Sequence, residues 1–254
     1  MPSPVSMDRR LVKYYRTAEN YRRYLVEDAE RLAALSQFFH RYWRYFGRSV
    51  LDLGCGGGVL GAVLRATRRQ YLGVDANPDM IREARRAAGA SGPRHRFLRG
   101  NIVQARIRGR FDTVTLLGNA LGHLSILEMD ELLRQRKSNV HRGSTFLTGY
   151  RDVVGMFWRG TWSRRPYVQT HKRGTVVSRT RSVNLQEGLI HIRARPGSGG
   201  WTVDFTHSIW SPFILEGMMR SHGWKLLKRD PGYAPNGKVE PDQWVDVYRF
   251  YEDA

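Results

Sequence analysis

The sequence is poor in cysteine and lysine, and it contains no long apolar run. Cys55 is the one cysteine, which excludes an internal disulfide framework and a cysteine-rich zinc site. The eight histidines form no tight HxxxH pair, so we expect no bound metal. No stretch approaches the ~18 apolar residues of a membrane-spanning helix, and MPSPVSMDRRLVKYY lacks the apolar centre of a secretory signal. These absences predict a cytoplasmic protein without a membrane partner.

Basic charge is present in excess and is unevenly distributed. Lys and Arg number 42 against 23 Asp and Glu, which gives a net charge of +19, and only six of the 42 are lysine. Such a balance suggests a nucleic-acid partner, whereas so strong a preference for arginine is also typical of biased genome composition, and both interpretations stay open. Residues 49–64 and 111–133 contain no Lys or Arg, whereas 151–195 contain ten basic residues against two acids. The oligomeric state is not predicted.

Segments typical of strands and helices alternate through the first 150 residues. Strands are expected at 49–53, 70–75, 95–101, 111–117 and 144–150, and helices at 8–47, 59–69, 78–88 and 125–133. Asn77 before Pro78 is a favourable helix start, and Ser125 and Glu128 have the spacing of a capping box. Alternation in units of this length predicts right-handed crossovers and a mostly parallel sheet.

The pattern changes in the second half of the chain. Three stretches with period-two alternation, at 175–183, 189–195 and 201–209, are separated by turn-forming residues and predict an antiparallel meander. A helix at 212–223 and an antiparallel strand pair at 224–230 and 244–252 should complete the first sheet. The predicted organisation is 1–47 amino-terminal helices, 48–150 core, 151–210 inserted basic β lid, and 211–254 closing helix and strands.

A glycine turn follows the first buried strand, in the run from Asp52 to Gly58. Glycines there let the backbone approach a ligand, and the following helix presents free N–H groups. Asp75 closes the next strand, where a carboxylate can accept both ribose hydroxyls of an adenosine. A phosphate-binding P-loop is excluded because no Lys-Ser or Lys-Thr follows the glycines. GxGxxG spacing also fits a dinucleotide, so the residues alone leave two cofactors open.

VLDLGCGGG, YLGVDANPDMI and FDTVTLLGNALGHL resemble, in order and spacing, the motifs of the Rossmann-like S-adenosylmethionine-dependent methyltransferases, over roughly residues 12–150. The resemblance implies that fold, with helices on both faces of the sheet and an antiparallel last strand, and S-adenosylmethionine as cofactor. Asp52 has no role in the dinucleotide fingerprint, so it favours this family over a nicotinamide enzyme.

The resemblance also implies which residues contact the cofactor. Asp52, Gly54 and Gly56 would line its methionine and ribose side. Asp75 would hold the ribose hydroxyls, and Asn101 stands where many relatives carry Asp. The full set is Tyr15, Asp52, Gly54, Cys55, Gly56, Asp75, Ala76, Asn77, Met80, Asn101, Ile102, Leu117 and Gly118. For Tyr15 the alternative is core packing of an amphipathic helix.

Methyl transfer from a sulfonium mainly needs alignment and exclusion of water, so no strong catalytic constellation is required. The candidates near the acceptor are His123, Asn119, Tyr150 and Arg151. GNALGHL resembles the GNSFAHL-type stretch of glycine and sarcosine N-methyltransferases. His123 either orients or deprotonates the acceptor, or is a structural histidine, and Arg151 suits an anionic group.

Three functions follow. The first is a methyltransferase for a small amine, carboxylate or hydroxyl compound. The second is an RNA methyltransferase that uses the basic insertion, although no NPPY-like motif or RNA-binding module is present. The third is a non-catalytic protein that binds the cofactor. Trp158, Trp162, Tyr167 and Trp201 would form either an aromatic wall for the acceptor or the insertion's own core.

Overall fold

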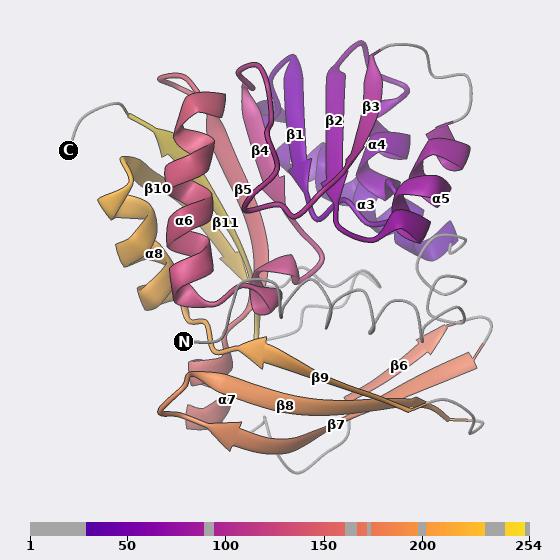
Figure 1. The fold of residues 1–254 in the computed structure, drawn as a ribbon, viewed down its shortest axis with the longest axis vertical. Coiled ribbons are helices and arrows are strands. Elements are labelled where there is room, and N and C mark those ends of the chain that lie inside the picture. Colours follow the sequence, from indigo (N-terminus) through magenta and orange to yellow (C-terminus); the bar gives the residue numbers. More distant parts are fainter. Residues whose placement is uncertain are drawn as a thin grey trace.

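The computed structural model describes residues 29–88, 94–160, 167–171, 174–197, 202–231 and 242–251. They form a seven-stranded, mostly parallel sheet flanked by helices and a separate four-stranded antiparallel sheet (Figure 1). The predicted α/β class, Rossmann-like sheet and inserted meander are therefore confirmed. Within this part of the chain, no helix is long and apolar enough to cross a membrane.

The large sheet has the order β10-β11-β5-β4-β1-β2-β3. Its strands are β1 (Ser49–Leu53), β2 (Gln70–Asp75), β3 (His95–Arg99), β4 (Thr113–Leu116), β5 (Thr145–Arg151), β10 (Trp224–Pro231) and β11 (Gln243–Phe250). β1 to β5 are parallel, and β11 runs antiparallel to both of its neighbours, which confirms the predicted closing pair. β3 and β4 are shorter than predicted because the chain turns away directly after Arg99 and Leu116.

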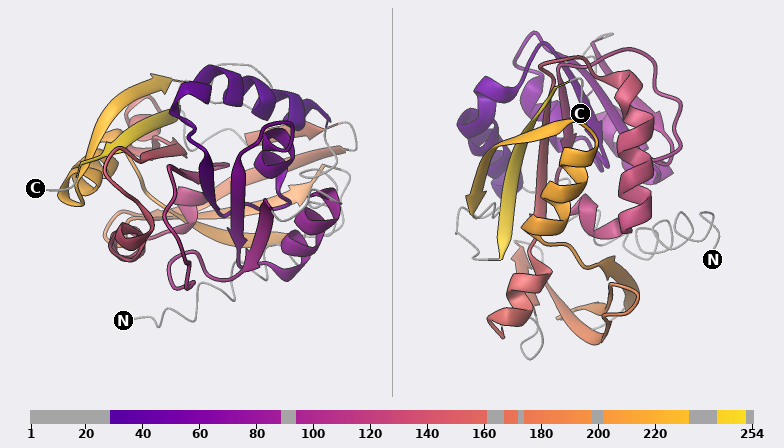
Figure 2. Two further views of the ribbon diagram at one scale, coloured as in Figure 1. Left: turned by 90° about the horizontal axis from the view of Figure 1, so that it is seen from above. Right: turned by 90° about the vertical axis from the view of Figure 1, so that its left-hand side faces the viewer.

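Helices cover both faces of this sheet. α3 (Ala29–Tyr42) and α4 (Val59–Leu64) lie on one face, and α6 (Ile126–Arg136) and α8 (Pro212–Ser221) lie on the other (Figure 2). α5 (Pro78–Ala88) packs beside α4 and against β3. α4 ends five residues before the predicted boundary, and residues 8–28 of the predicted first helix lie outside the described residues.

The predicted helix starts are present. The Asn77 side chain accepts a hydrogen bond from the N–H of Asp79 at 2.8 Å, and Ser125 and Glu128 form the reciprocal capping box. The Ser211 hydroxyl caps α8 by accepting a hydrogen bond from the N–H of Ile214. These bonds satisfy donors that a helix amino terminus leaves free.

The inserted sheet has one strand more than predicted. It contains β6 (Tyr167–His171), β7 (Gly174–Asn184), β8 (Leu189–Pro196) and β9 (Val203–Ser208), in that order. β6 was not predicted because YVQTH is short and does not alternate; its pairing with β7 determines its conformation. The helix α7 (Val153–Trp158), which Asp152 caps through the N–H of Gly155 at 2.8 Å, was also not predicted.

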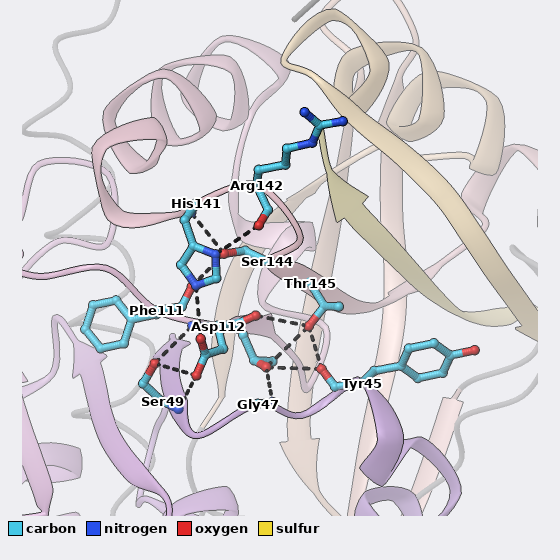
Figure 3. Close-up of polar contacts among 10 residues, drawn as sticks. Tyr45, Gly47, Ser49, Phe111, Asp112, His141, Arg142, Ser144 and Thr145 are labelled. Atoms are coloured by element: carbon cyan, nitrogen blue, oxygen red, sulfur yellow. Dashed lines mark hydrogen bonds and ion pairs between the residues drawn. The ribbon is translucent and has the colours of Figure 1, made fainter. Parts of the chain in front are cut away.

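Polar bonds tie the amino ends of three parallel strands together (Figure 3). The Asp112 carboxylate accepts the N–H of Ser49 at 2.9 Å and lies 3.0 Å from Nε2 of His141. Ser144, just before β5, donates its hydroxyl to the carbonyl of Phe111. The opposite edge, where β1, β2 and β4 end, is therefore left to the loops that carry the predicted site.

A buried carboxylate joins β5, β10 and β11. Asp246 is fully buried, and Oδ2 accepts the hydroxyls of Tyr248 at 2.6 Å and Tyr150 at 3.1 Å. Arg229 donates to both carboxylate oxygens at 2.8 Å each.

Replacement of this carboxylate should strongly destabilise the fold. Asp246→Ala leaves Nε of Arg229 and two tyrosine hydroxyls without their acceptor, while Arg229 keeps its bonds to Glu216 and to the carbonyl of Pro212. We therefore expect the free energy of unfolding in urea to fall by about 3 kcal/mol or more. Asp204→Asn is the control, because Asp204 pairs with Arg193 at an exposed position, and its cost should stay below about 1 kcal/mol. Equal losses for the two variants would contradict the assigned role of Asp246.

Candidate cofactor and acceptor site

The glycine turn after β1 borders free space at Gly56 and is closely packed at Gly58. Gly56 has φ +52°, and a Cβ built there meets nothing within 4 Å. Gly58 has φ +76°, but a Cβ there would lie 2.9 Å from the Cβ of Ala84 and 3.0 Å from the ring of Phe97. Gly58 therefore allows the close packing of α4 and α5, whereas Gly56 borders space that a ligand can fill.

Asp75, at the end of β2, is bonded to the backbone on both sides. Oδ2 accepts the N–H of Gly56 at 2.9 Å, and Oδ1 accepts the N–H of Asn77 at 2.8 Å. Burial raises the pKa of Asp75, and the two N–H bonds oppose that rise. Each carboxylate oxygen keeps a second lone pair, so the group can still accept two hydroxyls.

Beside Asp75, Asn77 is 2% exposed, and among the described residues its Nδ2 has no hydrogen-bond partner. Buried amide donors are normally paired, so a ligand acceptor is expected at this position. Ala76 is partly exposed, and Met80 is buried. A carboxylate that can accept two hydroxyls, the open glycine and this unpaired amide donor are the groups that an adenosine would need, and the assignment of Asp75 to the ribose stays a prediction.

The turn after β3 lies next to the same edge. The N–H of Gly100 donates to the carbonyl of Asp75 at 2.9 Å. Asn101 follows, and its Oδ1 accepts the N–H of Val103 at 2.8 Å. Ile102 is partly buried against the core. Both residues belong to the predicted cofactor set, and both follow a turn that is bonded to the end of β2.

Asp52 faces the interior of the sheet. Its two oxygens accept the hydroxyl of Tyr71 at 2.6 Å and that of Thr115 at 2.7 Å, and burial raises its pKa to about 6. Cys55 is also buried, and the N–H groups of Gly54 and Cys55 donate to the carbonyl of Val74. Asp52 thus links β1 to both neighbouring strands, and its role at a methionine group stays a prediction.

The segment after β4 lies against the glycine turn. Leu117 is buried and Gly118 is exposed; Asn119 (φ +62°) is the one non-glycine residue with positive φ in the described chain. A Cβ built on Gly54 would lie 3.2 Å from the Cβ of Ala120. A strained backbone conformation here is consistent with a functional segment.

A short 3-10 helix, Ala120–His123, brings His123 to the inserted sheet, which lies below the carboxyl ends of the parallel strands (Figure 1). The His123 ring meets that of His207, on β9, edge to face at a centroid distance of 4.6 Å, and Phe205 lies 4.9 Å beyond. Burial lowers the pKa of His123 to about 4; burial, His123 and Arg151 lower that of His207 well below its usual range. Both imidazoles are therefore uncharged at neutral pH.

His207 was not among the residues predicted from the sequence. The alternation of 201–209 places it on the same face as Val203 and Phe205, which was a usable indication that it points inward. No short-range pattern indicates that the ring meets His123.

Other predicted site residues lie elsewhere. Tyr150 is 3% exposed, burial and Asp246 raise its pKa, and its hydroxyl is bonded to Asp246 within the core. Trp158 is 92% exposed, so in this structure it forms neither the predicted wall nor a core. Tyr15, Trp162 and Trp201 lie outside the described residues, as does the Tyr167 side chain. Within the described ranges, no three His, Cys, Asp or Glu residues are grouped to hold a metal ion.

Comparisons with known proteins show what the chain is similar to. Residues 50–143 match a family model described as a methyltransferase domain. The ribosomal protein L11 methyltransferase of Thermus thermophilus is 35% identical over 103 residues, which are 41% of this chain and 39% of that protein. The chain thus aligns with less than half the length of this curated relative.

Two solved structures share the fold. An S-adenosylmethionine-dependent methyltransferase from Clostridium acetobutylicum has a TM-score of 0.70 at 16% identity, with 94% of this chain and 99% of that chain covered. An amino pentose methyltransferase from Micromonospora echinaspora, solved with S-adenosylmethionine bound, has a TM-score of 0.60 at 16% identity, with 86% and 89% covered. These two likenesses show that the fold is shared, and the methyltransferase-domain match favours S-adenosylmethionine over a nicotinamide.

The depressed pKa of His123 predicts a pH dependence of stability. Unfolding restores the ordinary pKa near 6.5, so the unfolded state binds the proton more tightly, and stability present above that pH is lost as pH falls toward 4. His123→Gln should therefore flatten the fall of the urea midpoint between pH 6.5 and 4. His191→Gln, at an exposed position on β8, should follow the wild-type curve. A His123→Gln curve parallel to the wild type would contradict this assignment.

Proposed function

We propose that this chain, which carries a Rossmann-like S-adenosylmethionine-dependent methyltransferase domain at residues 50–143, transfers a methyl group to a small-molecule acceptor. When bound, S-adenosylmethionine would supply the methyl group: an acceptor nucleophile forms a bond to the methyl carbon in line while the carbon–sulfur bond breaks, and S-adenosylhomocysteine leaves as a neutral thioether. The observation that carries the proposal is the Asp75 carboxylate, fixed by the N–H groups of Gly56 and Asn77 beside an open glycine.

On the donor side, each group has one task. Asp75 accepts the ribose hydroxyls. Nδ2 of Asn77, which is buried without a hydrogen-bond partner among the described residues, donates to an acceptor atom of the bound S-adenosylmethionine. Asn101 and Ile102 border the adenine, and Gly118 leaves room near the sulfonium. No Lys or Arg occurs in 49–64 or 111–133, so the glycine turn and the segment after β4 bring no basic side chain to a cationic donor.

On the acceptor side, the 3-10 helix and the inner face of the inserted sheet approach each other through His123 and His207. Uncharged imidazoles donate and accept hydrogen bonds without repelling the sulfonium. A pKa near 4 makes His123 a weak base, so its task is to orient the acceptor rather than to deprotonate an aliphatic ammonium ion. Asn119 assists from the same segment, and Arg151 acts on His207 electrostatically and can pair with an acidic group of the acceptor.

A small acceptor is supported by the inserted sheet, whose inner face is apolar. Ile190, Ala194 and Val203 are buried there. The amino pentose enzyme shows that the fold hosts such a substrate class. The likeness to glycine and sarcosine N-methyltransferases stays a prediction.

RNA is the second candidate acceptor, because exposed arginines lie on the other face of the insertion. Arg179 pairs in register with Arg193, and Arg195 follows along β8. A row of guanidinium groups suits a phosphate backbone. One of them, Arg193, is already paired with Asp204, which weakens this alternative.

The donor site is tested by Asp75→Ala. Loss of the carboxylate removes two charged hydrogen bonds to the ribose, so calorimetry should show affinity for S-adenosylhomocysteine reduced by about 10-fold or more. Asp79→Ala is the control, since Asp79 is a partly exposed acid on α5 that pairs with Arg82. Undiminished affinity in Asp75→Ala would show that Asp75 does not belong to the site. Binding of S-adenosylmethionine without any methylated product from a metabolite extract would favour a non-catalytic binding protein.

The acceptor class is tested by salt dependence. We expect the wild-type protein to show no salt-dependent binding to tRNA. Labelled methyl groups should appear in the small-molecule fraction of the extract. Binding that weakens by about 10³-fold between 50 and 200 mM salt, together with methylated tRNA, would establish RNA instead. Substituting Arg179 and Arg195 by Gln should then reduce the salt slope.

A further inference from the structure

The carboxyl end of α6 holds the segment that follows β3, residues 100–110. Nη2 of Arg136 donates to the carbonyl of Ala105 at 2.9 Å and to that of Val103 at 3.5 Å. Nδ2 of Asn139 donates to the carbonyls of Ile107 and Gly109, at 2.9 Å each. Two side chains, one from the last residue of α6 and one from the 3-10 helix Lys137–Asn139 that follows it, thus fix four carbonyls of this segment.

Burial of the charged Arg136 side chain at this position costs folding free energy. The side chain is 4% exposed, and Nε and Nη1 have no hydrogen-bond partner among the described residues. Burial lowers the pKa of the guanidinium, and no acid contributes to that shift. A buried cation of this kind often costs more stability than an apolar side chain of similar volume would. Stability alone therefore does not account for arginine here.

The carbonyls that Arg136 binds belong to a turn that begins beside Asp75. The N–H of Val103 donates to Oδ1 of Asn101, and the N–H of Ala105 donates to the carbonyl of Asn101 at 2.8 Å. Gly100, one residue earlier, is bonded to the carbonyl of Asp75. Arg136 thus fixes the far side of a turn whose near side is fixed to the ribose-binding strand.

We propose that Arg136 is a positioning residue for the binding of S-adenosylmethionine. Its two hydrogen bonds hold residues 101–105 in the conformation that borders the adenine. This inference rests on the proposed function. Arg136 itself does not contact the ligand and acts through Asn101 and Ile102. A flexible turn would have to be ordered when the ligand binds, and that ordering would reduce affinity.

The test is Arg136→Met, which keeps an apolar stem but removes both hydrogen bonds. We expect affinity for S-adenosylhomocysteine to fall by about 10-fold in calorimetry, while thermal stability stays equal to or above that of the wild type. Arg134→Met is the matched control, because Arg134 lies on the same helix in an exposed pair with Glu131. Its affinity should match the wild type.

Two further measurements locate the effect. 5′-Methylthioadenosine carries the adenine but no amino acid, so Arg136→Met should lose the same factor for this ligand. The amides of Val103 and Ala105 should exchange hydrogen faster in Arg136→Met. Arg136→Lys retains one donor group and should recover part of the affinity, and it also serves as the test variant if Arg136→Met does not fold.

The outcomes separate the two proposals. Wild-type protein that binds neither ligand would overturn the proposed function. Wild-type protein that binds while Arg136→Met binds equally well would overturn only the positioning role. A loss confined to S-adenosylhomocysteine would also overturn it, because the effect would then lie at the amino-acid end.

Discussion

Two backbone N–H groups meet on the carboxylate of Asp75, and the geometry of the candidate site depends on that arrangement. The bonds connect the glycine turn after β1 to the chain after β2. Further bonds from Gly54 and Cys55 to the carbonyl of Val74, and from Gly100 to that of Asp75, extend the connection to β3. Three loops are thereby fixed to adjacent strand ends before a ligand arrives, so little conformational entropy remains to be lost on binding.

The parts of the fold that follow from local chemistry could be predicted from the sequence. The five parallel strands are short apolar runs, and α5, α6 and α8 begin at residues whose side chains satisfy the first N–H groups. Asp75 and the glycine turn were predictable because their spacing repeats in a family, as the match over 50–143 supports. For the strands and helix starts the information is local, whereas for Asp75 it lies in the spacing to the glycine turn, 19 residues from Gly56.

The features that escaped prediction depend on distant partners. Tyr150 ends a strand that points toward the site, yet its hydroxyl is taken by Asp246, 96 residues further along the chain. His207 meets His123 only because β9 carries it there. Arg136 is one more basic residue at the end of a helix until the carbonyls of 103 and 105 are brought to it. Composition and periodicity carry no information about such pairs.

The insertion of β11 between β5 and β10 has a consequence for the order of folding during synthesis. β5 can pair with β4 as soon as both have left the ribosome, but its other edge waits for β11, after the whole inserted sheet has been made. Until then the nascent chain exposes an unpaired strand edge, which is prone to wrong pairing. Closure through such distant segments is intrinsically slow, so binding of a chaperone to the emerging chain would benefit this topology.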